Sequence, residues 1–211
     1  MNEQQARKAV VRWGRSLFAR GLTGGSSGNI SVRLEDGYLA TPTNSCLGFL
    51  QAPRLSLLDA AAAHIGGDKP TKELPLHLAF YENRPAAHAV VHLHSSFATA
   101  LSCLSDLDPA DAVPPLTPYV AMRVGKVALT AYARPGSPEI AAAVARLAPR
   151  HVAVLLQNHG PVACGASLED AVFAVEELEE ACKLALLTRG MPARLLGADA
   201  LDDLDRHFGP K

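Results

Sequence analysis

The stretch Ala89-Val90-Val91-His92-Leu93-His94-Ser95-Ser96 carries two histidines, two positions apart, at the end of a short apolar run. Such a run is typical of a buried β-strand, and alternate residues of a strand project from the same face. The imidazoles of His92 and His94 are therefore expected to point the same way, as two nitrogen ligands of one metal ion would. The same residues would also suit a strand with one histidine in the core and the other at its edge.

The composition around this stretch indicates a folded protein. The 211 residues predict a single domain, with a loosely packed acidic tail from about residue 192. Hydrophobic residues make up 48% of the chain, which suffices for a sizeable core. The net charge is -1 and the basic residues are scattered, so no nucleic-acid partner is expected. Four separate cysteines, a polar start and no membrane-length apolar run predict a cytoplasmic protein without a membrane segment.

Predicted helices and strands interleave along the chain. An amphipathic helix over 3–20 precedes a glycine-rich loop and a hairpin over 30–41. Segment 57–65 favours a strand, and 105–138 is rich in proline and irregular. Further helices are expected over 75–81, 97–104, 140–147 and 167–189, and further strands over 127–130, 151–156 and 162–164. This order predicts an α/β fold in layers.

Two residues elsewhere extend the histidine pair toward a metal site. His159 lies in the turn Asn158-His159-Gly160, where glycine allows a sharp bend, and would supply a third nitrogen while leaving a coordination position open. Glu73 precedes a helix start, where backbone N–H groups favour anions, and is the candidate acid/base. Simpler interpretations are a histidine that caps a turn and a first-turn glutamate that stabilises its helix.

Three clusters of small polar residues have the composition of anion-binding loops: Gly28-Asn29, Thr43-Asn44 and Thr71-Lys72. Glycine permits close backbone approach, hydroxyl and amide groups donate hydrogen bonds, and lysine adds a positive charge. Each cluster alone would also suit an ordinary turn. Together, beside a candidate metal site, they indicate a phosphorylated or carboxylated substrate.

These motifs resemble those of the class II aldolase/adducin family over about residues 5–190. The resemblance rests on 24–31, 41–43, 69–73, 90–95 and 156–160. It implies a three-layer α/β/α fold around a mostly antiparallel sheet, and a homotetramer with sites at subunit interfaces. Thr71-Lys72-Glu73, with Leu116-Thr117-Pro118-Tyr119 and Arg134-Pro135-Gly136, is similar to the 3-oxo-tetronate 4-phosphate decarboxylase subgroup.

The resemblance also implies roles for individual residues. His92, His94 and His159 would bind a divalent metal, usually Zn²⁺ with Mn²⁺ or Co²⁺ as alternatives, and Glu73 would join them when substrate is absent. Glu73 would be the acid/base, and Tyr119 falls near a tyrosine that a neighbouring subunit contributes. The positions that match phosphate contacts are Asn29, Thr43, Asn44, Thr71 and Lys72. Asn44 and Lys72 replace the glycine and the hydroxyl residue of many family aldolases.

The reaction expected from this resemblance is decarboxylation of a 3-oxo-tetronate 4-phosphate to dihydroxyacetone phosphate and CO₂ through a metal-stabilised enediolate. Retro-aldol cleavage also leaves an enediolate, so a fuculose-phosphate-like aldolase or a pentulose-phosphate 4-epimerase is the alternative. A dehydratase of a thiosugar phosphate would share the metal site. A non-catalytic adducin-like interaction module is the remaining alternative, and would be expected to lack the metal ligands that this chain has.

Overall fold

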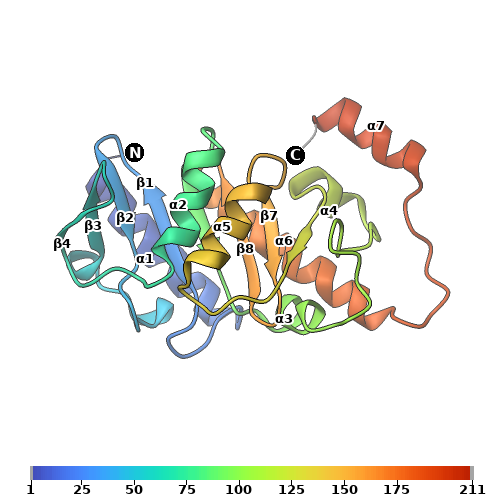
Figure 1. Ribbon diagram of the computed structural model, residues 1–211, viewed down its shortest axis with the longest axis horizontal. Coiled ribbons are helices and arrows are strands. Elements are labelled where there is room, and N and C mark those ends of the chain that lie inside the picture. The colour runs from blue at the N-terminus through green and yellow to red at the C-terminus, as the bar shows by residue number, and fades with distance from the viewer. Residues whose placement is uncertain (1, 210–211) are drawn as a thin grey trace.

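A single eight-stranded sheet runs through the middle of the molecule in the order β4-β3-β2-β1-β5-β8-β7-β6 (Figure 1). The computed structural model describes residues 2–209. The strands are β1 (Asn29–Arg33), β2 (Gly37–Ala40), β3 (Ser56–Asp59), β4 (His64–Gly66), β5 (Ala89–His92), β6 (Ala128–Thr130), β7 (Ala153–Leu156) and β8 (Gly160–Gly165). Neighbours pair antiparallel except β6 and β7, which are parallel. The predicted, mostly antiparallel α/β sheet is confirmed.

Helices cover both faces of this sheet. In Figure 1, α2 (Leu74–Asn83) and α5 (Pro138–Leu147) lie in front of the strands, with α1 (Glu3–Ala19) and α6 (Leu168–Leu187) behind them. The other helices are α3 (Ser96–Ser102), α4 (Pro118–Arg123), α7 (Ala198–Phe208) and the short 3₁₀ helices η1 (Leu47–Phe49) and η2 (Ala52–Arg54). The expected three-layer α/β/α arrangement is confirmed. Within residues 2–209, no helix combines the length and apolar character needed to cross a membrane.

The central strands are apolar on both faces, because each face packs against helices. On β5, Val90 belongs to the core beneath α2 and α5, whereas its neighbour Val91 belongs to the core beneath α1 and α6. Leu156 and Leu155 of β7 divide between the two cores in the same way. Full burial of each such side chain contributes roughly 1.5–3 kcal/mol. The middle of the sheet is therefore a rigid platform.

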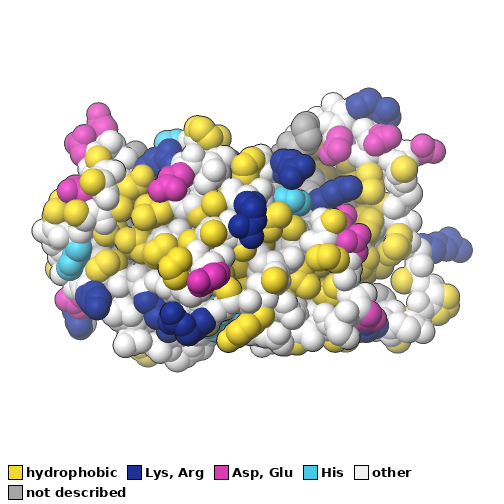
Figure 2. All heavy atoms as spheres, in the orientation of Figure 1, with side chains coloured by type: hydrophobic (Ala, Val, Ile, Leu, Met, Phe, Trp, Pro, Cys, Tyr) yellow, Lys and Arg dark blue, Asp and Glu magenta, His cyan; other side chains and the backbone are white. Residues whose placement is uncertain are grey.

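Three segments differ from the sequence-based expectation, and one of them is the helix α4, which lies within the stretch 105–138 that was expected to be irregular. The single strand expected over 57–65 is a hairpin of β3 and β4, because the Asp59 carboxylate accepts hydrogen bonds from the N–H groups of Ala61 and Ala63, both at 2.9 Å, and turns the chain. The tail beyond residue 192 contains the unpredicted helix α7, which has no buried residue. Hydrophobic side chains gather in the recess between α7 and α4 (Figure 2).

The position of β5 brings distant residues together. β5 runs antiparallel to both β1 and β8, so its C-terminal end lies beside the starts of those strands. The register pairs His92 with Asn29 on one side and with Val162 on the other. His159 immediately precedes β8, and therefore reaches the same end of the sheet as His92.

Candidate metal centre

Three imidazoles converge at this end of the sheet. The Nε2 atoms of His92 and His159 are 3.2 Å apart, and that of His94 lies 3.1 Å from each of the other two. His92 closes β5, His94 follows it by two residues, and His159 comes from the turn before β8. The structure thus brings together the three histidines that the sequence singled out.

The surroundings of these rings keep them in the form that binds metal. His92 Nδ1 donates a hydrogen bond to the carbonyl oxygen of Pro161 at 2.8 Å, which leaves Nε2 without a proton in the neutral ring. Burial holds the pKa of His92 well below its usual value and lowers the pKa of His94 and His159. Neutral imidazole nitrogens are metal ligands, whereas imidazolium is not.

The turn that carries His159 depends on glycine at position 160. Gly160 has φ +149°, and a Cβ atom there would lie 2.4 Å from the Leu93 carbonyl oxygen. Only glycine lets the turn approach β5 this closely. The bend predicted from the sequence therefore also sets the separation between His159 and the histidine pair.

Glu73 completes the group from the other side. It is the N-cap residue of α2, yet its carboxylate makes no capping hydrogen bond. Instead Oε2 lies 3.5 Å from His92 Nε2 and Oε1 lies 3.4 Å from His159 Nε2. Oε1 is buried and has no hydrogen-bond partner among the described residues. The interpretation of Glu73 as a residue that merely caps its helix does not fit this geometry.

The four side chains fit a divalent metal ion. For a tetrahedral site with metal–ligand distances of about 2.0–2.1 Å, neighbouring ligand atoms are about 3.3 Å apart. The contacts among the three histidines, and those of Glu73 with His92 and His159, range from 3.1 Å to 3.5 Å, and all four ligand atoms lie within 4.8 Å of one another. Three unshared nitrogens and an unpartnered carboxylate oxygen at these distances are costly unless a cation lies among them. Nitrogen with carboxylate oxygen is a donor set that suits Zn²⁺ and similar ions.

A pocket of about 250 Å³ opens over this centre. All the predicted anion-binding residues line it: Gly28, Asn29, Thr43, Asn44, Thr71 and Lys72. The pocket is also lined by Glu73, His94, His159 and Pro135. Tyr119 does not line it: this residue is the second of α4 (Pro118–Arg123) and is 57% exposed.

Two loops form the anion-binding side of the pocket and support each other. The Thr43 N–H donates to the Lys69 carbonyl at 2.9 Å, and the Thr71 N–H donates to the Thr41 carbonyl at 3.1 Å. Asn44 has φ +55°, in the left-handed region that asparagine and glycine adopt most readily. An asparagine can therefore form this turn, at the position where the resemblance places glycine in many family aldolases.

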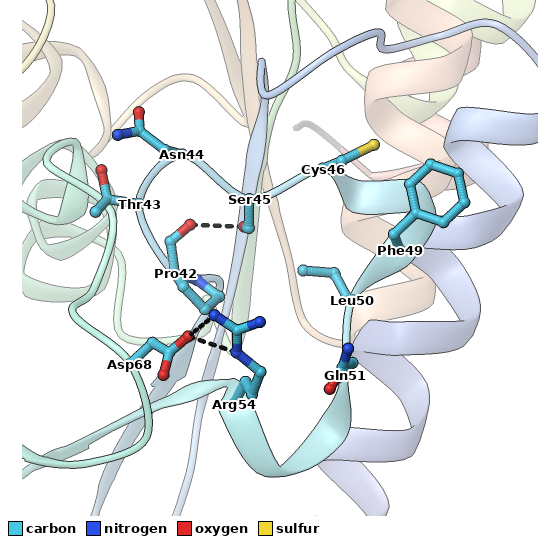
Figure 3. A pocket seen from close by; sticks show the side chains of 10 residues that line it. All are labelled: Pro42, Thr43, Asn44, Ser45, Cys46, Phe49, Leu50, Gln51, Arg54 and Asp68. Atoms are coloured by element: carbon cyan, nitrogen blue, oxygen red, sulfur yellow. Dashed lines mark hydrogen bonds and ion pairs between the residues drawn. The ribbon is translucent and has the colours of Figure 1, made fainter.

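Figure 3 shows the first of these loops from a neighbouring pocket. The side chains of Thr43 and Asn44 point away from Arg54, whose guanidinium is held by Asp68 at 2.6–2.7 Å. Arg54 does not line the pocket over the histidines, whereas Lys72 does. The positive charge beside the candidate metal centre therefore comes from Lys72.

Two buried residues near the site were not identified from the sequence. Glu179 of α6 accepts hydrogen bonds from Ser95 Oγ at 2.6 Å and from the N–H groups of Phe97 and Ala98 at 2.9 and 2.8 Å. It thereby anchors the turn that follows His94. His77, on α2, is fully buried behind Glu73. Both occupy apolar helix faces, so a polar residue inside an apolar stripe was the available signal.

The chain is similar to known proteins along most of its length. The family model described as "Class II Aldolase and Adducin N-terminal domain" matches residues 8–186. A 3-oxo-tetronate 4-phosphate decarboxylase of Pectobacterium atrosepticum is 50% identical, covering 96% of this chain and 94% of its own. L-fuculose phosphate aldolase of Escherichia coli K12 is 36% identical over 80% of this chain and 76% of its own. The crystal structure of YgbL from Klebsiella pneumoniae superposes with a TM-score of 0.94 at 51% identity, covering 97% and 99% of the two chains.

Proposed function

This chain belongs to the class II aldolase and adducin family, and we propose that it decarboxylates a 3-oxo-tetronate 4-phosphate to dihydroxyacetone phosphate and CO₂. The observation that carries the proposal is one pocket that Lys72 lines together with Glu73, His94 and His159, three members of the Glu/His₃ group. Relatives that are 50% identical over 96% of this chain carry the name of this activity. Relatives named as aldolases are more distant.

The substrate is a β-keto acid, and its chemistry defines what the site must do. The bond between the carboxylate carbon and C2 breaks, CO₂ leaves, and the electron pair passes to the C3 oxygen as an enediolate. A bound divalent ion supplies a Lewis acid for the substrate oxygens on which this charge develops. A proton must then reach C2 to give the hydroxymethyl group of the product.

Glu73 is the proposed acid that delivers this proton. Glu73 is 5% exposed, and its carboxylate oxygens lie within 3.5 Å of the Nε2 atoms of His92 and His159. Its Oε1 atom has no hydrogen-bond partner among the described residues and is the oxygen available to carry a proton. Because Glu73 is buried, it can protonate the enediolate at a place that bulk water reaches poorly.

His92, His94 and His159, with Glu73 in the absence of substrate, are the proposed ligands of the ion, which we propose to be Zn²⁺ with Mn²⁺ or Co²⁺ as alternatives. Gly28, Asn29, Thr43, Asn44, Thr71 and Lys72 are the proposed contacts for the phosphate and carboxylate groups. Tyr119 would act from a neighbouring subunit of a homotetramer, because within one chain it stays outside the pocket. A cytoplasmic location suits the four free cysteines.

The test is an assay of the Zn²⁺-loaded protein against 3-oxo-tetronate 4-phosphates and ketose 1-phosphates such as fuculose 1-phosphate. The expected result is release of CO₂ together with dihydroxyacetone phosphate from the acid, and little cleavage of the ketose. Protein treated with a chelator is the control and should be inactive until Zn²⁺ is restored. Aldehyde release from the ketose without CO₂ from the acid would make the chain an aldolase instead.

A further inference from the structure

A chain of buried hydrogen bonds runs from Glu73 into the core of the protein. Asn29 Nδ2 donates to Glu73 Oε2 at 2.9 Å, and Asn29 Oδ1 contacts His77 Nε2 at 2.5 Å. On the far side of the ring, His77 Nδ1 lies 2.7 Å from Ser31 Oγ, which itself lies 2.7 Å from the Tyr81 hydroxyl. The chain therefore links the candidate acid to a tyrosine on the second turn of α2.

The donors and acceptors of this chain can be assigned in only one consistent direction. The Glu73 carboxylate only accepts hydrogen bonds, so the Asn29 amide must present its NH₂ group to it and its oxygen to His77. His77 must then carry its proton on Nε2 and accept through Nδ1. Ser31 donates to His77 Nδ1, and Tyr81 donates to Ser31. Every hydrogen bond in the chain thus points toward Glu73.

The surroundings hold this arrangement in place. Asn29, Ser31, His77 and Tyr81 are each no more than 5% exposed. Burial lowers the pKa of His77 to about 3, so the ring stays neutral and Nδ1 stays free to accept. The Tyr81 ring stacks on Tyr38 with ring centres 5.2 Å apart, and the guanidinium carbon of Arg33 lies over the Tyr81 ring, 4.9 Å from its centre. Tyr81, the end of the hydrogen-bond chain that lies farthest from Glu73, is therefore fixed by packing.

We propose that His77 is a positioning residue for Glu73: through Asn29 it holds Oε2 in a hydrogen bond and leaves Oε1 as the oxygen that transfers the proton. The proposal rests on the acid role of Glu73 in the proposed function. Without the His77 N–H, the Asn29 amide is free to rotate, and its oxygen can then face the carboxylate. Two oxygens in contact would push Glu73 away from the three histidines.

Ser31 has a distinct part in this arrangement. A neutral imidazole carries its proton on either nitrogen, and the partner of one nitrogen selects the state of the other. The Ser31 hydroxyl donates to Nδ1 and thereby keeps the proton on Nε2, where Asn29 needs it. The serine thus selects the tautomer of a histidine that contacts neither substrate nor metal ligand.

Two substitutions of His77 separate positioning from mere core packing. Glutamine in His77→Gln places an amide N–H near the position of Nε2 and keeps the donor for Asn29. Asparagine in His77→Asn places its amide near Nδ1 and keeps only the contact with Ser31. We expect kcat to fall at least about tenfold in His77→Asn and by less than about threefold in His77→Gln. KM and metal content should stay within twofold of wild type in both.

A stability control accompanies these variants. Phe80→Leu alters the same helix in the core beneath α2 and has no part in the hydrogen-bond chain. It should lower Tm while kcat stays within about twofold. Equal losses of kcat in His77→Asn and His77→Gln, or losses that follow Tm as in Phe80→Leu, would overturn the positioning role.

A second measurement does not depend on turnover. Long-range ¹H–¹⁵N spectra of metal-free protein with ¹⁵N-labelled histidine report which ring nitrogen carries the proton. We expect the Nε2–H tautomer for His77, and a shift toward Nδ1–H in Ser31→Ala. A wild-type His77 protonated on Nδ1 would refute the proposal even if the enzyme is active. Failure to release CO₂ with the Nε2–H tautomer intact would instead refute the proposed function.

Discussion

The two sides of the candidate pocket differ in burial. On the ligand side, Glu73, His92 and His159 are at most 7% exposed, whereas His94 at the edge is exposed. On the anion side, Thr71 is buried and Thr43 is half-buried, whereas Asn44 and Lys72 are exposed. Most of the side chains proposed to bind the metal and to transfer the proton are therefore held by the surrounding protein before substrate binds. The residues proposed to bind the substrate's anionic groups are in part open to solvent. Substitutions on the ligand side should change metal binding and kcat, and substitutions on the anion side should change KM.

The largest effect is expected for a ligand. His94→Ala removes one of three converging nitrogens, and should abolish stoichiometric metal binding and lower activity by about a thousandfold or more. The fold should persist, because His94 lies at the exposed edge of the centre. Metal analysis after dialysis and circular dichroism measure the two outcomes. His88→Ala, an exposed histidine beside the opposite end of β5, is the control. A full complement of metal in His94→Ala would remove His94 from the site.

The next largest effect on activity is expected for Glu73, the proposed acid. Glu73→Gln keeps the volume of the side chain but cannot donate and recover a proton, so kcat should fall by about 10²–10⁴-fold. KM should change little, because the anion side is intact. Steady-state kinetics of the metal-loaded variant measure both quantities. Glu169→Gln, an exposed glutamate in the first turn of α6, is the matched control. Turnover near that of wild type would exclude Glu73 as the acid.

Replacing Glu179 tests whether the histidines need the hydrogen bonds by which α6 holds the turn after His94. Glu179→Ala leaves three donors around Ser95 without their acceptor and should cost about 3 kcal/mol of unfolding free energy. Metal affinity should also weaken by about tenfold, because Ser95 directly follows His94. Urea unfolding and a competitive metal titration measure these losses. Glu176→Gln breaks only an exposed ion pair with Arg20 and should cost less than about 1 kcal/mol. Equal costs in the two variants would contradict the anchoring role.

The cluster of three histidines was predictable from the sequence to a large extent, because its members carry local patterns. His92 and His94 share a strand-like stretch, and Gly160 marks the turn that aims His159. The pairing of β5 with both β1 and β8 has no local signal, because it is decided by packing across the whole sheet. The family resemblance, and not periodicity, supplied that part of the fold.

Residues whose roles depend on tertiary contacts were harder to predict. Asn29 stays a proposed phosphate contact, but the sequence did not indicate that its amide also links Glu73 to His77. Glu179 lies on the stripe of Val175 and Cys182, a position where a charge signals a buried partner. Tyr119 was placed by resemblance alone, and a single chain leaves it outside the pocket. The role of Tyr119 remains a prediction about a neighbouring subunit.

Acid should weaken the buried region behind the ligand side. The folded-state pKa of His77 is about 3, below the value of about 6.5 expected for an unfolded chain. Between these values only the unfolded state binds the proton, so stability falls as pH falls below about 6.5. From pH 7 to pH 5 the cost from His77 alone is about 2 kcal/mol. Urea unfolding of metal-free protein at both pH values should show this loss reduced in His77→Gln. The loss of unfolding free energy should keep its full size in His88→Gln. If the loss also kept its full size in His77→Gln, His77 would be charged in the folded protein at pH 5.

The smallest effect is expected on the anion side, at Lys72. Lys72→Met removes a positive charge that is exposed to solvent, so KM for a doubly anionic substrate should rise by about tenfold, or about 1.4 kcal/mol. The variant's KM should also respond less to added salt than that of wild type. Lys69→Met, in the same loop but outside the pocket, controls for a general change in charge. A loss of kcat at constant KM would place Lys72 with the ligand side, since its charge would then act on the transition state and not on capture of the substrate.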